Sequence, residues 1–121
     1  MIEKLIAAIN PRLPLTILRA EWCDPVLSLI GADWTFNTTS SWRLIDGSKL
    51  VAGSEDQLAS EAVSALAGVE MVRCEPMSVS PLLDPRFLFG NGLKLEVFSA
   101  TATEPWVLSL KGGPTFVASP S

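Results

Sequence analysis

The stretch that decides the fold is WTFNTTSSWRLIDGSKLVA, which runs from Trp34 to Ala52. It contains three short runs rich in β-branched, aromatic and aliphatic residues, which are separated by polar turns: 34–38, 42–45 and 49–52. Such runs between turn residues are typical of strands. The second turn contains Asp46-Gly47, a pair favoured in tight hairpins because both residues tolerate a positive φ. We therefore predict successive antiparallel strands here.

The same pattern continues on both sides of this stretch. Further strands are predicted at 15–22, 27–31, 69–74, 87–89, 93–98, 106–110 and 115–118. Within 93–98, Leu93, Leu95 and Val97 should face the core, whereas Lys94 and Glu96 should face water. The chain is therefore expected to form antiparallel β meanders.

Two helices are expected beside the strands. Residues 1–9 form a short apolar stretch that carries Glu3 and Lys4, which fits an amphipathic N-terminal helix better than a secretion signal. Residues 54–68 are the strongest helical segment, with Ser54 as the N-cap, Gln57 completing a capping box, and Gly68 at the C-terminal end. Its predicted core face is Leu58, Ala62, Ala65 and Leu66. The fold class is α+β, with the central helix packed on the sheet.

The two halves of the chain are similar in sequence pattern. Trp42-Arg43-Leu44, followed by Gly47, parallels Trp106-Val107-Leu108, followed by Gly112-Gly113. Either the chain contains two similar halves, or hairpins rich in Val, Ala and Ser resemble one another by chance. If the halves are equivalent, the two tryptophans mark equivalent core positions.

Length and composition bound the remaining possibilities. The chain has 121 residues, 48% of them hydrophobic, which predicts a single α+β domain over residues 1–121. Its mean hydropathy is +0.34, yet no run approaches the roughly 18 apolar residues that span a bilayer. We expect a cytoplasmic protein with no membrane association.

The net charge of −4 has a particular location. Glu55, Asp56, Glu61 and Glu70 occur between Lys49 and Arg73 with no basic residue among them. Nucleic-acid binding requires clustered basic residues, and the nine Lys and Arg are scattered along the chain. The sequence therefore favours a basic protein partner for Glu55, Asp56 and Glu61, and argues against DNA or RNA.

The residue types exclude most catalytic mechanisms. The chain has no histidine, which removes the commonest general base and the best zinc ligand. Cys23 and Cys74 lie beside acidic residues and have no metal-type spacing, so we expect two buried free thiols. Carboxylate pairs such as Glu96 with Glu104 remain conceivable. We predict a protein that is not an enzyme and has no catalytic residues, cofactor or metal.

Tryptophan and arginine are enriched at the energetic centres of protein interfaces. Most of the four tryptophans should be core residues. Trp34 and Trp42 lie next to the polar turn from Asn37 to Ser41 and to Arg43, so Trp34, Trp42 and Arg43 are predicted to contribute to a binding face. Two rivals stay open. One is a small-molecule pocket lined by Trp34, Phe36, Trp42 and Trp106. The other is a homodimer or larger homo-oligomer that pairs edge strands at 15–22 and 115–118.

Four motifs give the chain a family resemblance: Leu29-Ile30-Gly31, Trp34-Thr35-Phe36, Trp42-Arg43-Leu44 and Glu104-Pro105-Trp106-Val107-Leu108. Over residues 26 to 119 the pattern resembles small bacterial domains of unknown function, some of them found among polymorphic-toxin immunity proteins. The resemblance implies an α+β domain with a protein-binding role. It implies no functional residue, because these families have no catalytic motif to match.

Overall fold

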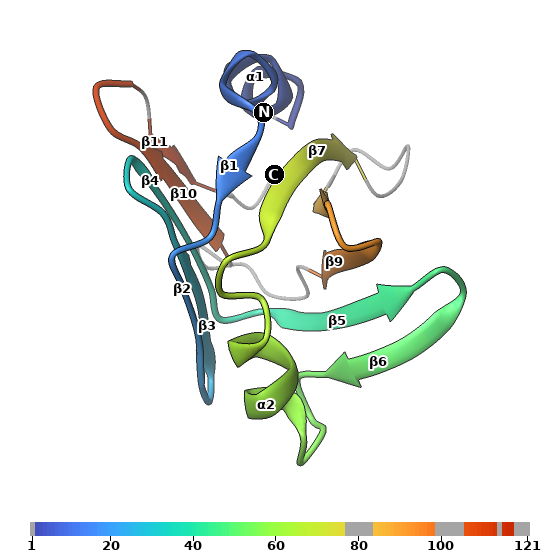
Figure 1. Cartoon of the computed structure of the whole chain (residues 1–121). Helices are drawn as coiled ribbons and strands as arrows, with labels where there is room; N and C mark the ends of the chain where they lie inside the picture. The colour runs from blue at the N-terminus through green and yellow to red at the C-terminus, as the bar shows by residue number, and fades with distance from the viewer. Residues whose placement is uncertain (1, 77–83, 99–105, 114, 118–121) are drawn as a thin grey trace.

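The computed structural model describes residues 2–76, 84–98, 106–113 and 115–117. These residues form two antiparallel sheets that face each other (Figure 1). The six-stranded sheet has the order β1 (Leu15–Thr16), β7 (Glu70–Pro76), β8 (Pro85–Phe89), β9 (Leu93–Phe98), β5 (Ser41–Asp46) and β6 (Lys49–Gly53). The five-stranded sheet has the order β11 (Thr115–Val117), β10 (Trp106–Leu110), β4 (Trp34–Thr38), β3 (Val26–Ile30) and β2 (Arg19–Cys23).

Two helices lie at opposite ends of the space between the sheets (Figure 1). Helix α1 (Ile2–Ile9) continues into the 3-10 turn η1 (Asn10–Arg12) and contacts β7. Helix α2 (Ala59–Ser64) contacts β2 and β6, which are edge strands of different sheets. The α+β class is therefore correct, but the central helix bridges two sheet edges and does not lie on a sheet face.

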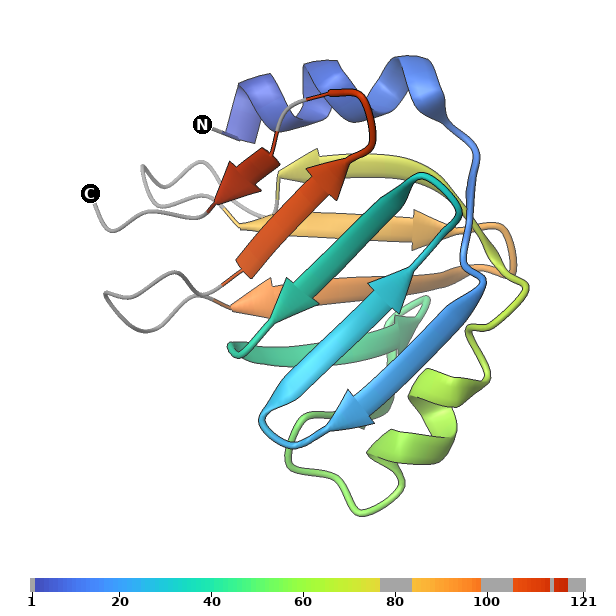
Figure 2. The same cartoon turned by 90° about the vertical axis from the view of Figure 1, so that its left-hand side faces the viewer.

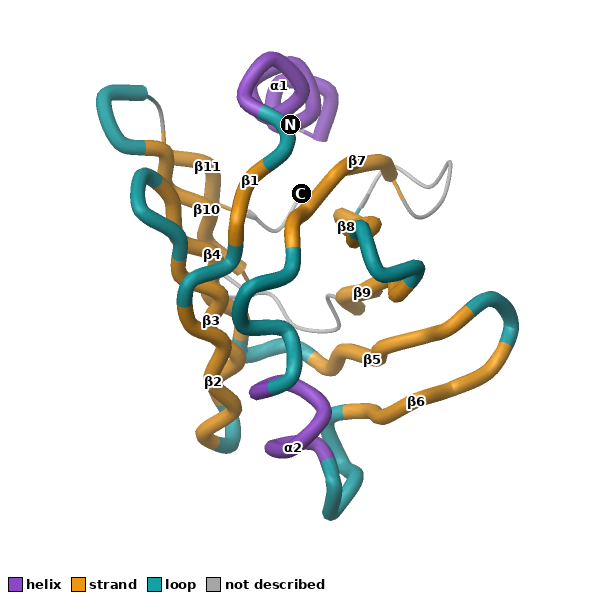
Figure 3. The backbone as a smooth tube through the Cα atoms, viewed as in Figure 1, coloured by secondary structure: helices purple, strands orange, loops and turns teal. Residues whose placement is uncertain are grey.

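The predicted strand 15–22 is wrong, because the chain changes sheets in its middle. The Ile17 amide donates to the Val69 carbonyl at 2.9 Å, whereas the next amide, of Leu18, donates to the Ile30 carbonyl at 2.8 Å. Two adjacent peptide groups therefore belong to different sheets, and the segment becomes β1 and β2. Figure 3 shows this crossing beside the loop that joins α2 to β7. The other predicted strands are present, and their bounds lie within two residues of the expected ones.

The predicted helix 54–68 is also too long, since only 59–64 are helical. Ser54 does not cap it; instead the Asp56 carboxylate accepts the Leu58 amide at 3.1 Å, in a side-chain turn that competes with helix. The buried face is Ala59, Val63 and Leu66, and the predicted core residue Leu58 is exposed. Gly68 does adopt the left-handed conformation that ends the segment, with a φ of 87°.

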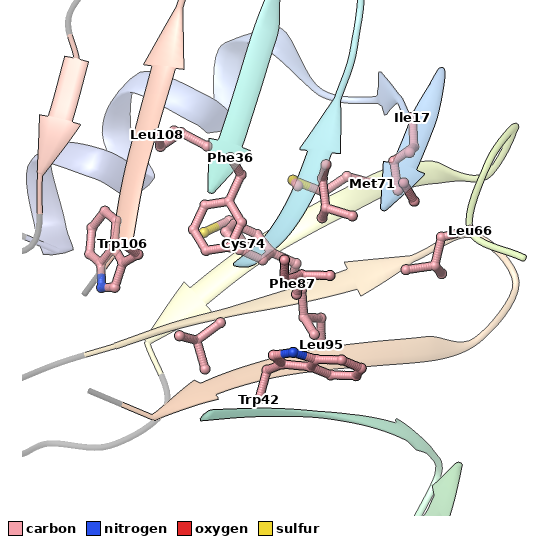
Figure 4. Packing of buried hydrophobic residues seen from close by; sticks show 14 of the residues in the cluster. Ile17, Phe36, Trp42, Leu66, Met71, Cys74, Phe87, Leu95, Trp106 and Leu108 are labelled. Atoms are coloured by element: carbon pink, nitrogen blue, oxygen red, sulfur yellow. The ribbon is translucent and has the colours of Figure 1, made fainter. Parts of the chain in front are cut away.

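One hydrophobic cluster fills the space between the sheets and extends from Leu5 in α1 to Phe116 in β11. Phe36 of the five-stranded sheet meets Phe87 of the six-stranded sheet edge to face, with ring centroids 4.9 Å apart (Figure 4). Trp22 and Trp42 make a second contact between the sheets at 5.3 Å. These rings tie the two sheets together at their centre.

Each half of the chain contributes to both sheets. The first half places the meander β2–β3–β4 in the five-stranded sheet and the hairpin β5–β6 in the other. The second half places the meander β7–β8–β9 in the six-stranded sheet and the hairpin β10–β11 in the five-stranded sheet. Each hairpin therefore pairs with the third strand of the other half's meander. Among the described residues, no helix is long and apolar enough to cross a membrane.

Candidate functional site

Three adjacent hollows in the surface meet at Glu55, and we call them together the Glu55 hollow. Their volumes are about 590, 530 and 600 Å³. The first lies along the hairpin β5–β6 and Phe98, the second beside the β2–β3 turn, and the third between Leu50 and Leu58. All three share the segment in which β6 ends and the chain turns toward α2.

Local hydrogen bonds hold this segment in place. The Ser54 amide donates to the Trp42 carbonyl at 3.0 Å, which adds a final rung to the β5–β6 ladder. The Asp56 amide then donates to the Gly53 carbonyl at 3.0 Å, and this turns the chain away from the sheet. Glu55 lies between these two bonds and is exposed, so its carboxylate is presented at the junction of the three hollows.

The Glu55 hollow is acidic. Asp24, Glu55 and Asp56 line it, and Arg43 is the basic residue among its lining residues. Arg43 is already engaged, since its Nε atom lies 2.5 Å from the Glu96 carboxylate and its guanidinium lies 5.0 Å from the centroid of the Phe98 ring. The Asp56 carboxylate accepts the Leu58 amide, and the exposed side chains of Asp24 and Glu55 complete the acidic lining.

Two exposed leucines, Leu50 and Leu58, line the third hollow. Leu50 is 59% exposed and Leu58 is 61% exposed, which makes them the most exposed of the large hydrophobic residues in the described chain. Val51, the neighbour of Leu50 on the edge strand β6, is also exposed. The hollow therefore combines carboxylates with uncovered aliphatic side chains.

The structure brings four of the six predicted site residues together. Glu55, Asp56, Arg43 and Trp42 line the Glu55 hollow, although the Trp42 ring is buried and packs against Trp22 between the sheets. Glu61 lies on α2, is exposed, and does not line the hollow.

The tryptophans differ from the expectation of an exposed ring. Trp34 lies at the start of β4, away from the polar turn that follows this strand. It is buried, and its indole Nε1 donates to the Thr16 carbonyl at 3.3 Å. Trp42 and Trp106 are also buried, and only Trp22 among the four is half-buried. Phe36 packs near Trp106 in the core, so these rings fill the space in which a ligand pocket was considered.

Sequence reasoning missed an ion network on the outer face of the six-stranded sheet. The Glu96 carboxylate is held by Arg43 from β5 and by Arg86 from β8, whose Nη2 atom lies 2.7 Å away. Arg86 also lies 3.1 Å from Glu75, which in turn pairs with Arg73 at 3.4 Å. The signal was present as charged residues at alternating positions, but only the strand order shows that they adjoin.

Burial and pairing explain the electrostatics of this network. Glu96 was expected to face water, yet it is only 3% exposed because the arginines cover it. Burial alone would lower the pKa of Arg86, but its hydrogen bonds with Glu75 and Glu96 outweigh that effect and raise the pKa. The network neutralises a carboxylate that would otherwise be costly to bury.

The two cysteines differ in burial. Cys74 is buried, and burial followed by the charge of Glu75 raises its pKa to about 12, so the thiol stays protonated. Cys23 is exposed, which contradicts the expectation of two buried thiols. No group of His, Cys, Asp or Glu in the described parts of the chain could hold a metal ion. Glu104 lies outside the described residues.

Comparisons with known proteins assign no family. The chain matches no family model, and no curated protein and no solved structure is significantly similar to it. The resemblance to immunity-type domains therefore stays a prediction.

Proposed function

We propose that the chain is a non-enzymatic protein-binding domain, of the immunity or accessory type, whose Glu55 hollow receives a basic partner. The observation that carries the proposal is the convergence of Asp24, Glu55 and Asp56 on one concave surface, where the basic lining residue is engaged with Glu96. Complementary charge gives a partner a faster approach and a defined orientation.

Leu50 and Leu58 support a protein partner over a small ion. Exposed aliphatic side chains beside a hollow gain free energy only when something apolar covers them. A partner that places an apolar side chain between the two leucines and a lysine or arginine beside Glu55 would satisfy both features of the surface. Protein surfaces commonly present an apolar side chain next to a lysine or arginine, whereas few metabolites combine the two groups.

The test is capture and titration with the tagged chain as bait in its native host. We expect a basic protein that binds with a defined stoichiometry and is weakened at least about tenfold by the double variant Glu55→Lys with Asp56→Lys. Glu70→Lys is the matched control, because Glu70 is an exposed acid on β7 that does not line the hollow. Retention of no partner, or equal loss with the control, would overturn the proposal.

We also propose that the chain consists of two equivalent halves. The order of elements supports this, because a helix, a three-stranded meander and a crossing hairpin occur twice. The meanders begin with matching segments, Arg19-Ala20-Glu21 and Arg73-Cys74-Glu75, and in each segment the arginine pairs with the glutamate. Ala20 and Cys74 are both buried between these charged residues.

The spacing of 54 positions that separates Arg19 from Arg73 also relates the two helices and the segments that follow them. Leu5 and Ile9 of α1 are buried, as are Ala59 and Val63, which occur 54 positions later. The segments 15–17 and 69–71, which the same spacing of 54 positions relates, pair with each other, with Leu15 opposite Met71 and the Ile17 amide bonded to the Val69 carbonyl. An antiparallel pairing between equivalent segments is what a twofold axis between the halves requires. The test is whether Trp42→Ala and Trp106→Ala, at equivalent core positions, lower the free energy of unfolding by equal amounts.

A further inference from the structure

The outer face of the five-stranded sheet carries no charge over four of its strands, and we call this part the uncharged face. On the fifth, the edge strand β2, Arg19 and Glu21 point outward beside Ile30 and Ser28 and form an ion pair with each other. Residues on β3, β4 and β10 alternate between buried and half-buried or exposed positions, so their outward side chains can be identified directly. These include Val26, Ser28, Ile30, Thr35, Val107 and Ser109. The outward residues of β11, Thr115 and Val117, are uncharged as well.

The equivalent face of the six-stranded sheet is different. Where β10 has Val107 beside Asn37, β5 has Arg43 beside Glu96. Where β3 has Ser28, β8 has Arg86, which again pairs with Glu96. The two faces share a strand arrangement, but only one of them carries charged residues at these positions.

No described helix or loop covers the uncharged face. Figure 2 shows the five-stranded sheet toward the viewer, with α1 and α2 lying beyond its two ends. An antiparallel sheet that faces water usually has a polar and charged outer surface. Here Val and Ile alternate with Ser, Thr and Asn, which leaves aliphatic groups half-exposed.

We propose that a second copy of the chain stacks on this face, so that the two five-stranded sheets pack against each other about a twofold axis. Such an interface places each surface against itself, so a charged face would bring like charges together and an uncharged face would not. This matters for a chain with a net charge of −4. Sheet-on-sheet packing is a common way to cover the apolar side of a sheet.

The polar residues of the face also suit burial. Ser28 and Asn37, on adjacent strands, already hydrogen-bond to each other with their side-chain oxygens 2.6 Å apart. Because the Ser28 hydroxyl and the Asn37 carbonyl oxygen keep this hydrogen bond in the dimer, burying them does not carry the full cost of unpaired polar groups. The remaining gain comes from Val26, Ile30 and Val107, whose side chains leave water in the dimer.

This dimer goes beyond the proposed function, because none of the outward residues lines the Glu55 hollow. A heterologous partner and a second copy would occupy different surfaces. Failure of either proposal leaves the other standing, since the partner is tested by capture and the dimer by the mass of the pure protein.

The experiment is sedimentation equilibrium, with light scattering after size exclusion, on the pure chain and two matched variants. We expect a concentration-dependent mass that rises toward twice 13.0 kDa. Ile30→Lys should weaken the dimer at least about tenfold, because it buries two unpaired cations. Leu88→Lys is the control, since Leu88 is the half-buried outward residue in the middle of the other sheet and lies opposite Lys94.

Each alternative outcome is decisive. A mass of 13.0 kDa at all concentrations up to about millimolar would overturn the proposal. A dimer that survives Ile30→Lys, or one that Leu88→Lys disrupts equally, would place the interface elsewhere. Should Ile30→Lys fail to fold by circular dichroism, Val107→Lys on β10 tests the same face from another strand.

Discussion

In the proposed arrangement of two equivalent halves, the same order of elements serves different surfaces. Inside the molecule they agree: Trp42 and Trp106 are both almost fully buried, and so are Leu29 and Phe87 on the second strands of the two meanders. Outside, the two sheets differ: the six-stranded sheet carries the ion network on its outer face, whereas the outer face of the five-stranded sheet is charged only on its edge strand β2. The comparison indicates that burial sets the alternation in each half, whereas the outward residues are free to specify different contacts.

The hairpins show the same divergence. In β10–β11 the register is regular, and Phe116 is buried against the core. In β5–β6 the register shifts at Leu44 and Ile45, and Leu50 and Val51 are left exposed on the edge strand. A bulge bends a strand and changes where its side chains point. It therefore distinguishes the hairpin that closes the core from the hairpin that borders the Glu55 hollow.

The largest expected effect tests the equivalence of the two tryptophans. Trp42→Ala and Trp106→Ala should each lower the free energy of unfolding by about 3–5 kcal/mol, because each leaves a large cavity in the core. Urea denaturation followed by circular dichroism measures both. Neither indole nitrogen has a hydrogen-bond partner in the described structure, so the phenylalanine variants should lose much less. A difference above about 2 kcal/mol between the two alanine variants would break the equivalence.

The next effect contrasts the outer faces at equivalent positions. Glu96→Ala should cost about 2–3 kcal/mol, since it removes the buried carboxylate that Arg43 and Arg86 share. Asn37→Ala, at the matching position of the other sheet, should cost less than about 0.5 kcal/mol because Asn37 is exposed. The same denaturation curves provide the comparison. Equal costs would show that the ion network adds no stability beyond that of a polar pair.

A smaller effect concerns the turns of the two hairpins. Gly47 and Gly112 have φ values of 63° and 71°, a region that residues with a Cβ atom rarely adopt. A Cβ atom at either position would have no described atom within 4 Å beyond its chain neighbours, so the cost of alanine is conformational only. Gly47→Ala and Gly112→Ala should therefore each cost about 1 kcal/mol. Thermal unfolding of both variants checks the pair, and a neutral result at one turn would show that its backbone can relax.

Local patterns predicted most of the strands, because alternation and turn residues such as Asp46-Gly47 are local signals. They could not predict the division of 15–22, since the separation of Ile17 from Leu18 depends on Val69 and Ile30, which are distant in sequence. The helix was overestimated for a similar reason. The Asp56 side chain satisfies a backbone amide outside the helix, and this alternative has no signature in hydrophobic spacing.

The candidate site was predictable in part. Glu55 and Asp56 were identified from charge, and the structure places them on one surface with Arg43 and Trp42. The contributions of Asp24 and Leu58 were not predicted, because the first comes from another sheet and the second was assigned to the core. Cross-strand networks such as that of Glu96 depend on strand order, which local sequence does not specify.

The smallest expected effect is the sharpest test of equivalence, since it compares two ion pairs at matched exposed positions. Arg19 and Arg73 have side chains that are 68% and 67% exposed, and each pairs with the glutamate two residues later on its own strand. Exposed pairs of this kind contribute little because water screens them and two long side chains must be ordered. Arg19→Ala and Arg73→Ala should each change the free energy of unfolding by less than about 0.5 kcal/mol, measured by urea denaturation at low and high salt.

Glu75 keeps Arg86 as a partner when Arg73 is lost, so the Arg73 variant should also be the less sensitive to salt. A cost well above about 1 kcal/mol for Arg73→Ala would mean that the network on the six-stranded sheet acts as one cooperative unit, and that the two halves differ in energy where they match in sequence.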